Sequence, residues 1–477
     1  MFSTGKSKTI AGIILKILPK LRSKQKILVC APSNNACDEL MRRILDQFVE
    51  QNIDYDAGQY RKDWKQKKES LKMFYDLGSV IRVASQPPDD HRLCDHFFDF
   101  MVMCEVVDMI KSRGYVTTNE VRKAENYIIK RAKVIISTLN YCASARLHQL
   151  NGKVAFVIID EATQSLEADS LLPFRFGCAK ILLVGDPLQL PPTVLSDAGK
   201  EYNLSQSLYT RLYERFFSTE PINKLPITML ETQYRMYEDI CRFPSQLFYN
   251  NRLLTDPSIQ QNYEHFPLKP LYYYNITLSK HTYDDASSAF NLTEEDIIRH
   301  FSTQLVSYFY SLRTQDDEQD NVVTELDYEL ISNVSTSSNS LDDILQPPTI
   351  DGSNPIVIDI CKRIAVITPY RAQVRRLKEC LSPYIEVGTV DGFQGKEKDI
   401  VLISCVRSNM AQNAIGFLND MKRLNVMLTR SKYALYIFGN FTQFSQLHEG
   451  WKQLVDDAKH RNIIEDIQAF LPTLPLK

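Results

Sequence analysis

Two acidic residues, Asp160 and Glu161, directly follow the apolar run VAFVII at 154–159. One carboxylate at the end of a buried strand can hold Mg²⁺, and the next can accept a proton from an attacking water or orient it. Adjacent acids are also typical of a solvated turn, but the hydrophobic strand before this pair favours the catalytic interpretation. The pair therefore indicates metal-assisted attack of water on a phosphate.

The segment TGKS at 4–7 stands before an amphipathic helical pattern and matches the second half of a phosphate-binding loop, G-x-x-x-x-G-K-[ST]. Backbone N–H groups at the start of a helix favour a phosphate. In this interpretation Lys6 meets the β- and γ-phosphates, and Ser7 holds Mg²⁺. A GKS tripeptide alone is usually a chance match, and here the first glycine of the motif would stand before Met1.

The segment GDPLQLPPTV at 185–194 follows another apolar run. Gly185 and the prolines indicate a rigid, sharply turned loop. Gln189 can both donate and accept hydrogen bonds, so it suits sensing a γ-phosphate without fixing its charge. A plain proline-rich turn is the alternative.

Two arginines stand in otherwise apolar surroundings, Arg235 in LETQYRM (230–236) and Arg430 in LNVMLTRSK (424–432). Each is either solvent-facing or an arginine finger that stabilises charge on a transferring phosphoryl group. Tyr234, beside Arg235, either stacks on a base or fills the core.

Glycines and hydroxyl residues recur in TPYRAQ (368–373) and VGTVDGFQGKEKD (387–399). The glycines permit close backbone approach, and Thr368 and Thr389 offer hydroxyls to a phosphate or ribose. Glu397 either accepts from a ribose hydroxyl or pairs with a neighbouring lysine.

The elements that must position these residues are apolar runs of strand length. Because such runs are typical of parallel strands with both faces covered by helices, ligands are expected at their carboxyl ends. The gap between residues 186 and 362 predicts two αβ lobes. The runs are 26–32, 133–139, 154–161, 180–186, 362–370, 400–406 and 434–440.

Composition excludes several classes of protein. The chain has 477 residues, 44% hydrophobic and 24% charged, which is close to a globular average and unlike a disordered or collagen-like chain. No run reaches about 18 apolar residues, so we expect no membrane partner. Ten scattered cysteines without zinc spacing predict free thiols rather than disulfides or a metal centre.

Charge is unevenly distributed along the chain. Residues 314–353 hold ten acids and no Lys or Arg, which leaves 56 basic against 48 acidic residues elsewhere, or +8. This balance allows nucleic acid as a partner. The same stretch lies in a segment, 312–355, that we interpret as an acidic, flexible surface loop. The segment 54–133 is interpreted as helical insertion material, with a basic run around Trp64 that either clamps a strand or forms a solvated helix face.

Nine segments in order resemble the motifs of superfamily 1 helicases of the 5′-to-3′ group, which contains senataxin and the nonsense-mediated-decay helicase. Several of them look most like the senataxin branch. The resemblance covers nearly the whole chain apart from the two insertions and the last twenty or so residues. The segments are TGKSKTI, APSNNACDEL, STLNYCAS, DEATQ, GDPLQLPPTV, ETQYRM, TPYRAQ, TVDGFQGKEKDIVLISCVRSN and GFLNDMKRLNVMLTRSK.

The resemblance implies an α/β fold of two RecA-like parallel-sheet lobes in tandem, at 1–222 and 223–460, followed by a tail at 461–477. It implies that ATP and Mg²⁺ bind between the lobes and that hydrolysis drives strand translocation. Asp160 and Ser7 would hold Mg²⁺, Glu161 would activate water, Gln189 would sense the γ-phosphate, and Arg235 and Arg430 would act as fingers. The remaining nucleotide contacts would be Thr4, Gly5, Lys6, Tyr234 and Glu397.

The implied substrate is single-stranded RNA or DNA, or an RNA/DNA hybrid, moved through in the 5′-to-3′ direction. Small hydroxyl and amide residues suit contacts that do not depend on base sequence. We further expect a monomer that meets transcription or RNA-processing proteins in the nucleus, with the cytoplasm as the alternative. The implied strand contacts are Pro32, Ser33, Asn34, Ser137, Thr138, Thr368, Pro369, Tyr370 and Thr389.

The missing start of the phosphate loop is the main departure from the family pattern. We expect the first lobe to lack a central strand, and our hypothesis is a truncated product or incomplete gene model of an active helicase. The alternative is a catalytically impaired paralogue that binds nucleic acid without turnover. A generic GTPase is disfavoured because no guanine-reading motif is present.

Overall fold

The computed structural model describes residues 4–50, 80–219, 226–263, 266–318, 353–408, 415–467 and 472–477. Two predicted features therefore lie largely outside the described residues, namely the basic run with Trp64 and most of the acidic segment 312–355. The chain forms two compact units, Gly5–Leu230 and one containing Glu231–Lys477, here called the first and second lobes. The sequence placed this boundary at 222/223.

The first lobe is built on a five-stranded sheet in the order β2-β3-β1-β4-β5, with every pairing parallel. The predicted runs form four of these strands. These strands pair without interruption, and β5 lies at one edge of the sheet with Lys180 and Ile181 exposed, so the expected absence of a strand stays a prediction. The strands are β1 (Lys26–Ala31), β2 (Val80–Val83), β3 (Val134–Thr138), β4 (Val154–Ile159) and β5 (Lys180–Leu183).

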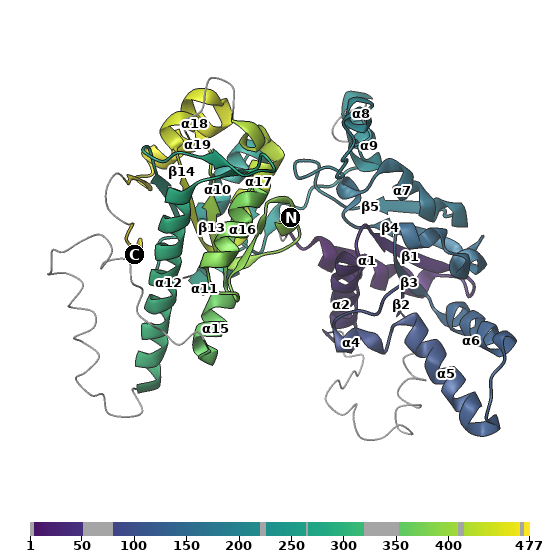
Figure 1. Cartoon of the computed structure of the whole chain (residues 1–477). Coiled ribbons are helices and arrows are strands. Elements are labelled where there is room, and N and C mark those ends of the chain that lie inside the picture. Colours follow the sequence, from purple (N-terminus) through teal and green to yellow (C-terminus); the bar gives the residue numbers. More distant parts are fainter. Residues whose placement is uncertain are drawn as a thin grey trace. The chain divides into compact units, whose positions relative to one another are not determined.

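Helices cover both faces of this sheet, as the apolar runs predict. Alternate residues of β1 point to opposite faces, so Ile27 and Val29 belong to one buried cluster and Leu28 and Cys30 to the other. Figure 1 shows these helices around the sheet. They are α1 (Lys6–Ile17) and α2 (Asn34–Glu50) on one face, and α5 (Phe98–Arg113) and α6 (Thr118–Arg131) on the other. Shorter or peripheral helices are α4 (His91–Cys94), α7 (Glu167–Leu171), α8 (Asp197–Glu201) and α9 (Leu208–Thr219).

Strand β2 corrects the interpretation of 54–133 as wholly helical. Val80–Val83 pairs with β3 and is buried along its whole length. Arg82 interrupts the apolar pattern, which hid the strand in the sequence. Its guanidinium is 1% exposed and donates to Asp38 Oδ1 (2.9 Å) and Asn34 Oδ1 (2.8 Å) on α2, so the charge is compensated by residues distant along the chain.

The second lobe is built on a six-stranded parallel sheet in the order β12-β11-β13-β14-β8-β15. The strands are β8 (Leu271–Asn275), β11 (Ile364–Thr368), β12 (Glu386–Thr389), β13 (Lys398–Ser404), β14 (Ser431–Gly439) and β15 (Ile464–Asp466). Two small pairs accompany it, β6 (Thr232–Gln233) with β7 (Leu254–Thr255), and β9 (Thr282–Tyr283) with β10 (Ala289–Phe290). Both lobes are therefore parallel-sheet α/β units, as predicted.

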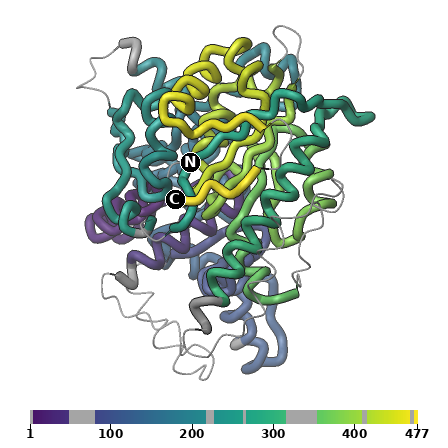
Figure 2. Tube along the Cα trace, turned by 90° about the vertical axis from the view of Figure 1, so that its left-hand side faces the viewer, coloured from purple at the N-terminus to yellow at the C-terminus, as the bar shows by residue number. Residues whose placement is uncertain are grey.

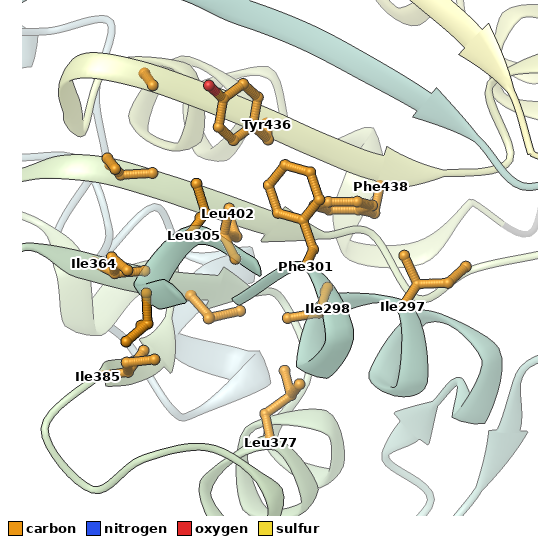
Figure 3. Close-up of a cluster of buried hydrophobic side chains, with 14 of the residues drawn as sticks. Ile297, Ile298, Phe301, Leu305, Ile364, Leu377, Ile385, Leu402, Tyr436 and Phe438 are labelled. Atoms are coloured by element: carbon orange, nitrogen blue, oxygen red, sulfur yellow. The ribbon is translucent and has the colours of Figure 1, made fainter. Parts of the chain in front are cut away.

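Helix α12 (Leu292–Glu318) provides much of the core on one face of this sheet. The Phe301 ring is fully buried and meets the rings of Tyr274, Tyr436 and Phe438 edge-on, with centroids 5.2–5.4 Å apart. Figure 3 shows Phe301 beside Tyr436 and Phe438. The other helices of the lobe are α10 (Glu238–Tyr249), α11 (Pro257–Tyr263), α15 (Pro355–Lys362), α16 (Arg371–Cys380), α17 (Met421–Leu428), α18 (Phe441–Leu447) and α19 (Glu449–His460).

Two predicted boundaries change in this lobe. Residues 312–318, which we included in the acidic loop, continue helix α12, and α15 begins at Pro355. The described part of the segment 461–477 belongs to the second lobe, because β15 pairs with β8 and Leu476 bridges to Leu268. Figure 2 marks the C-terminal end of the chain. No helix among the described residues is long and apolar enough to cross a membrane.

Candidate functional site

The start of α1 is shaped to receive an anion. Gly5 caps the helix with φ 73°, a left-handed conformation that glycine adopts without strain, and the Gly5 carbonyl accepts the Thr9 N–H at 2.7 Å. No side chain caps the first turn, which contains Lys6 and Ser7 and no acid. First-turn N–H groups have no partner within a helix, so this end can cradle a phosphate. Thr4 falls outside the compact unit that contains these residues.

Asp160 and Glu161 lie at the carboxyl end of β4, next to the start of α1. The Asp160 N–H donates to Cys30 O at 2.8 Å, which fixes the turn, and the Ser7 side chain is hydrogen-bonded to the Asp160 carboxylate. Burial and the neighbouring Glu161 raise the pKa of Asp160 above its usual value, while Lys6 opposes the shift. The structure therefore brings together Lys6, Ser7, Asp160 and Glu161, as the motif interpretation requires.

The backbone conformation and hydrogen bonding of Glu161 differ from those of Asp160. Its backbone is left-handed, with φ 54°, which is uncommon outside glycine. The Gln164 amide donates to Glu161 Oε2 at 2.6 Å. Burial raises the pKa of Glu161, Lys6 opposes this, and Asp186 adds to it. A carboxyl kept basic by burial is suited to accepting a proton from water.

Gln189 and Asp186 extend the same cluster. The Gln189 amide donates to Asp186 Oδ2 at 2.9 Å, and Gln189 Oε1 is buried without a hydrogen-bond partner. Gly185 passes so close to Thr163 that a Cβ there would lie 2.9 Å from Thr163 Cγ2. Asp186 was missed in the sequence, where its position directly after an apolar run was the available signal.

The donor set fits Mg²⁺. Carboxylate and hydroxyl oxygens are the protein ligands that Mg²⁺ prefers, and it usually keeps several waters. Asp160 and Ser7 supply such a pair. The described residues contain no group of three or more His, Cys, Asp or Glu side chains arranged for a metal, but a water-rich magnesium site needs no such group.

The predicted strand contacts of the first lobe all lie at the carboxyl edge of its sheet. Pro32, Ser33 and Asn34 follow β1, and Ser137 and Thr138 end β3 beside it. Several of their polar atoms already have partners within the lobe: Ser137 Oγ donates to Val83 O at 3.0 Å, and Asn34 Oδ1 accepts from Arg82. Ser33 is exposed.

In the second lobe, Arg235 and Glu397 form a close ion pair although they are far apart in sequence. Arg235 Nε donates to Glu397 Oε2 at 2.7 Å, and Arg235 Nη1 donates to Thr429 O at 2.9 Å. Burial alone would raise the pKa of Glu397, but Arg235 and Lys432 outweigh it and hold that pKa below its usual value. The neighbouring Tyr234 is 50% exposed.

Arg430 is fully buried rather than solvent-facing. Its guanidinium donates to Val426 O at 2.9 Å and to Thr429 Oγ1 at 2.8 Å. Because Thr429 O also accepts from Arg235, both predicted arginine fingers converge on the turn after α17.

The remaining predicted strand contacts end β11 and β12. Thr368 and Thr389 are register partners, and Thr368 Oγ1 is buried without a hydrogen-bond partner. Pro369 and Tyr370 follow directly and lead into α16. These four residues therefore share the carboxyl edge of the second-lobe sheet, where ligands of parallel sheets bind.

Comparison with known proteins agrees with this architecture. A family model described as "AAA domain" matches residues 204–442, just over half of the chain, and another with that description matches 2–84 and 104–197. The chain therefore belongs to the AAA-domain family.

Three curated proteins with similar sequences are named as helicases. The protein "Helicase sen1" of Schizosaccharomyces pombe is 30% identical over 97% of this chain and 29% of its own length. The human "Probable helicase senataxin" is 29% identical over 97% of this chain and 18% of its own length. The yeast "ATP-dependent helicase NAM7" is 31% identical over 92% of this chain and 39% of its own length. The chain is thus a senataxin-like member of superfamily 1, and it spans well under half the length of these relatives.

A solved structure titled "Complex structure of Arterivirus nonstructural protein 10 (helicase) with DNA" matches 94% of this chain and 61% of its own, with a TM-score of 0.41 and 11% identity. This likeness adds nothing to the assignment, which stands on the family models and the sheet topology.

Proposed function

We propose that the chain is an ATP-dependent translocase of single-stranded nucleic acid. The observation that carries this proposal is the cluster in the first lobe, where the start of α1 with Lys6 and Ser7 meets Asp160 and Glu161. A phosphate cradle beside two buried carboxyls is what hydrolysis of a nucleoside triphosphate needs. Relatives named as helicases support the same chemistry.

Each residue of the cluster has a definite task in this proposal. First-turn N–H groups and Lys6 bind the phosphates, and Ser7 and Asp160 would hold Mg²⁺, which supplies neutralisation of phosphate charge. Glu161 orients the attacking water and accepts its proton. Gln189, oriented by Asp186, uses its unpartnered Oε1 to hold that water or the γ-phosphate.

The second lobe contributes charge and strand binding. We infer that Arg235 reaches the nucleotide when the lobes close on it, and that the fully buried Arg430 supports Arg235 through the Thr429 turn. We further infer that Tyr234 stacks on the base and Glu397 meets the ribose. ATP can drive such closure only through a higher affinity for the closed state. The finer features of the proposal are 5′-to-3′ movement on RNA or an RNA/DNA hybrid, work beside transcription or RNA-processing proteins, and nuclear residence. They rest on resemblance to the senataxin branch.

The test is ATP hydrolysis by the whole chain, with and without oligo(U), oligo(dT) or an RNA/DNA hybrid. We expect strand-stimulated turnover that falls about 10²–10⁴-fold in Glu161→Gln, because loss of a general base typically costs that much. Strand affinity should be unchanged in this variant. Folded wild-type chain that binds strands without hydrolysis would refute the motor and leave a binding protein.

A further inference from the structure

The turn after β13 holds a valine in a rarely adopted conformation. Val406 is fully buried and has φ 66°, in the region that favours glycine. The Arg407 N–H donates to Cys405 O at 2.7 Å, which closes a three-residue turn around Val406. A β-branched residue at positive φ is a genuine outlier that persists only where its surroundings impose it.

The start of α12 imposes this turn. Glu294 Oε2 accepts the Val406 N–H at 2.8 Å and the Ser404 hydroxyl at 2.6 Å. Asn291 Nδ2 donates to Val406 O at 3.0 Å. Both backbone polar groups of Val406 are thus bound by side chains more than 100 residues away in sequence. Glu294 itself is fully buried, and its Oε1 has no hydrogen-bond partner.

The turn delivers Arg407 to an aromatic surface. Arg407 is 8% exposed and donates through Nη1 to the Tyr283 hydroxyl at 2.6 Å, with its guanidinium carbon 5.8 Å from the ring centroid. His281 Nε2 lies 3.2 Å from the same hydroxyl. These contacts fix Tyr283 by its hydroxyl, yet 54% of the residue remains exposed.

A second exposed ring, that of Phe417, packs against Tyr370. The Phe417 ring centroid is 5.6 Å from that of Tyr370, and Phe417 is 52% exposed. The guanidinium of Arg423 lies 5.1 Å from the Phe417 centroid. Arg407 and Tyr283 are both close enough to Tyr370 to influence its pKa. Exposed rings backed by guanidinium groups at the carboxyl edge of the sheet are the elements of a base-stacking platform.

We propose that Tyr283 and Phe417, together with Arg407, form a base-stacking surface for single-stranded nucleic acid, and that Glu294 is the positioning residue that sets it through the Val406 turn. The inference rests on the proposed function, because it assumes that the chain binds single strands. The proposal adds three residues to the strand contacts implied by the motifs, namely Tyr283 on β9, Phe417 before α17 and Arg407 after β13.

The surface is tested by strand binding without nucleotide. Fluorescence anisotropy of labelled oligo(U) and oligo(dT) is measured on the whole chain at one fixed salt concentration, because phosphate contacts make affinity salt-dependent. The Tyr283→Ala/Phe417→Ala double variant should bind about 10-fold more weakly or worse, since losing one stacked base typically costs about 5- to 160-fold. The matched control is Tyr384→Ala, which alters a 41% exposed tyrosine before β12, at the opposite edge of the same sheet.

Wild-type affinity in the double variant would overturn the surface while leaving the translocase proposal intact. A wild-type chain that binds neither strand would overturn both. Weaker binding of the double variant to oligo(U) alone, or to both oligo(U) and oligo(dT), would support the surface. The comparison of the two oligonucleotides would also show whether the surface accepts RNA only or both RNA and DNA.

The role of Glu294 is separated from mere stability by a conservative rescue and a mutant cycle. Glu294→Gln keeps an acceptor for Ser404 and Val406 and should bind strands as wild type does. Glu294→Leu, of similar size, should weaken binding about as much as loss of the rings. Added to the Tyr283→Ala/Phe417→Ala variant, it should weaken binding no further, because coupled residues are non-additive. Full additivity, or wild-type affinity in Glu294→Leu, would contradict the positioning role.

Discussion

The buried carboxyl of Glu294 makes the stability of the second lobe depend on pH, and replacing it with Gln should remove that dependence. Burial raises the pKa of Glu294 from its ordinary 4.5 to about 8, and hydrogen bonds from Ser404 and Val406 only partly oppose the shift. A carboxyl whose pKa is higher in the folded chain stabilises the fold fully at low pH, and this contribution is lost as the pH rises towards the folded value. The amide of Gln does not titrate.

The size of the effect follows from that shift. Between the two pKa values, each pH unit costs about 1.4 kcal/mol of folding free energy. Because the slope falls off as the pH approaches the folded pKa, the wild type should lose about 2 kcal/mol relative to Glu294→Gln from pH 6 to pH 8. For a lobe of this size, that corresponds to a shift in melting temperature of about 5–9 °C. The nearby Cys405 thiol stays neutral over this range, because burial raises its pKa well above the usual value.

The assay is thermal unfolding of the wild type and Glu294→Gln at half-unit steps from pH 6 to pH 8.5, followed by circular dichroism. The gap between the two melting temperatures should widen with pH and level off above about pH 8. A constant gap would show that Glu294 is already ionised at pH 6, which would refute the reasoning from burial.

Two further substitutions test the first-lobe loop and the nucleotide contact. Gly185→Ala should lower the free energy of unfolding by about 1–3 kcal/mol through overpacking, since its Cβ would lie 2.9 Å from Thr163 Cγ2 and 3.1 Å from the Thr163 backbone nitrogen. The control is Gly12→Ala in α1, which should raise the free energy of unfolding by about 0.5–1 kcal/mol, because its Cβ would lie 3.8 Å from the nearest neighbouring atom, Gln47 Oε1. Equal melting temperatures of the two variants would contradict the packing argument. Tyr234→Ala should raise the KM for ATP, because it removes the ring proposed to stack on the base. It should change the free energy of unfolding by less than about 0.5 kcal/mol, because the residue is 50% exposed. Tyr234→Phe should keep the wild-type KM, and an unchanged KM in Tyr234→Ala would exclude stacking.

Local patterns determined most of the sheet framework. Central parallel strands are buried on both faces, so they appear as uninterrupted apolar runs, and all seven predicted runs form strands. Strands whose sequences lack that pattern were not predicted. In β12 the sequence is EVGT, and β2 carries Arg82, whose charge is acceptable only because Asp38 and Asn34 fold against it.

The central residues of the candidate active site could also be predicted from short segments of the sequence. Gly5–Ser7 and Asp160–Glu161 each follow directly from one short segment, because a helix start and a strand end position their own side chains. Their pairing was not local, since it takes the sheet to place the end of β4 beside the start of α1.

Charge burial was decided only by the tertiary structure. Glu294 stands in the segment NLTEED, which is typical of a solvated helix start, and its partners Ser404 and Val406 lie on a distant strand. For Arg430 the sequence left open whether the side chain faces solvent or a phosphate, but the guanidinium donates to backbone and hydroxyl oxygens inside the lobe. By itself, the sequence determined the parallel αβ lobes and predicted the residues of the candidate phosphate site, because periodicity and strand-end residues are local properties. The environment of each ionisable group depends on long-range neighbours, and only the packed lobes decided it.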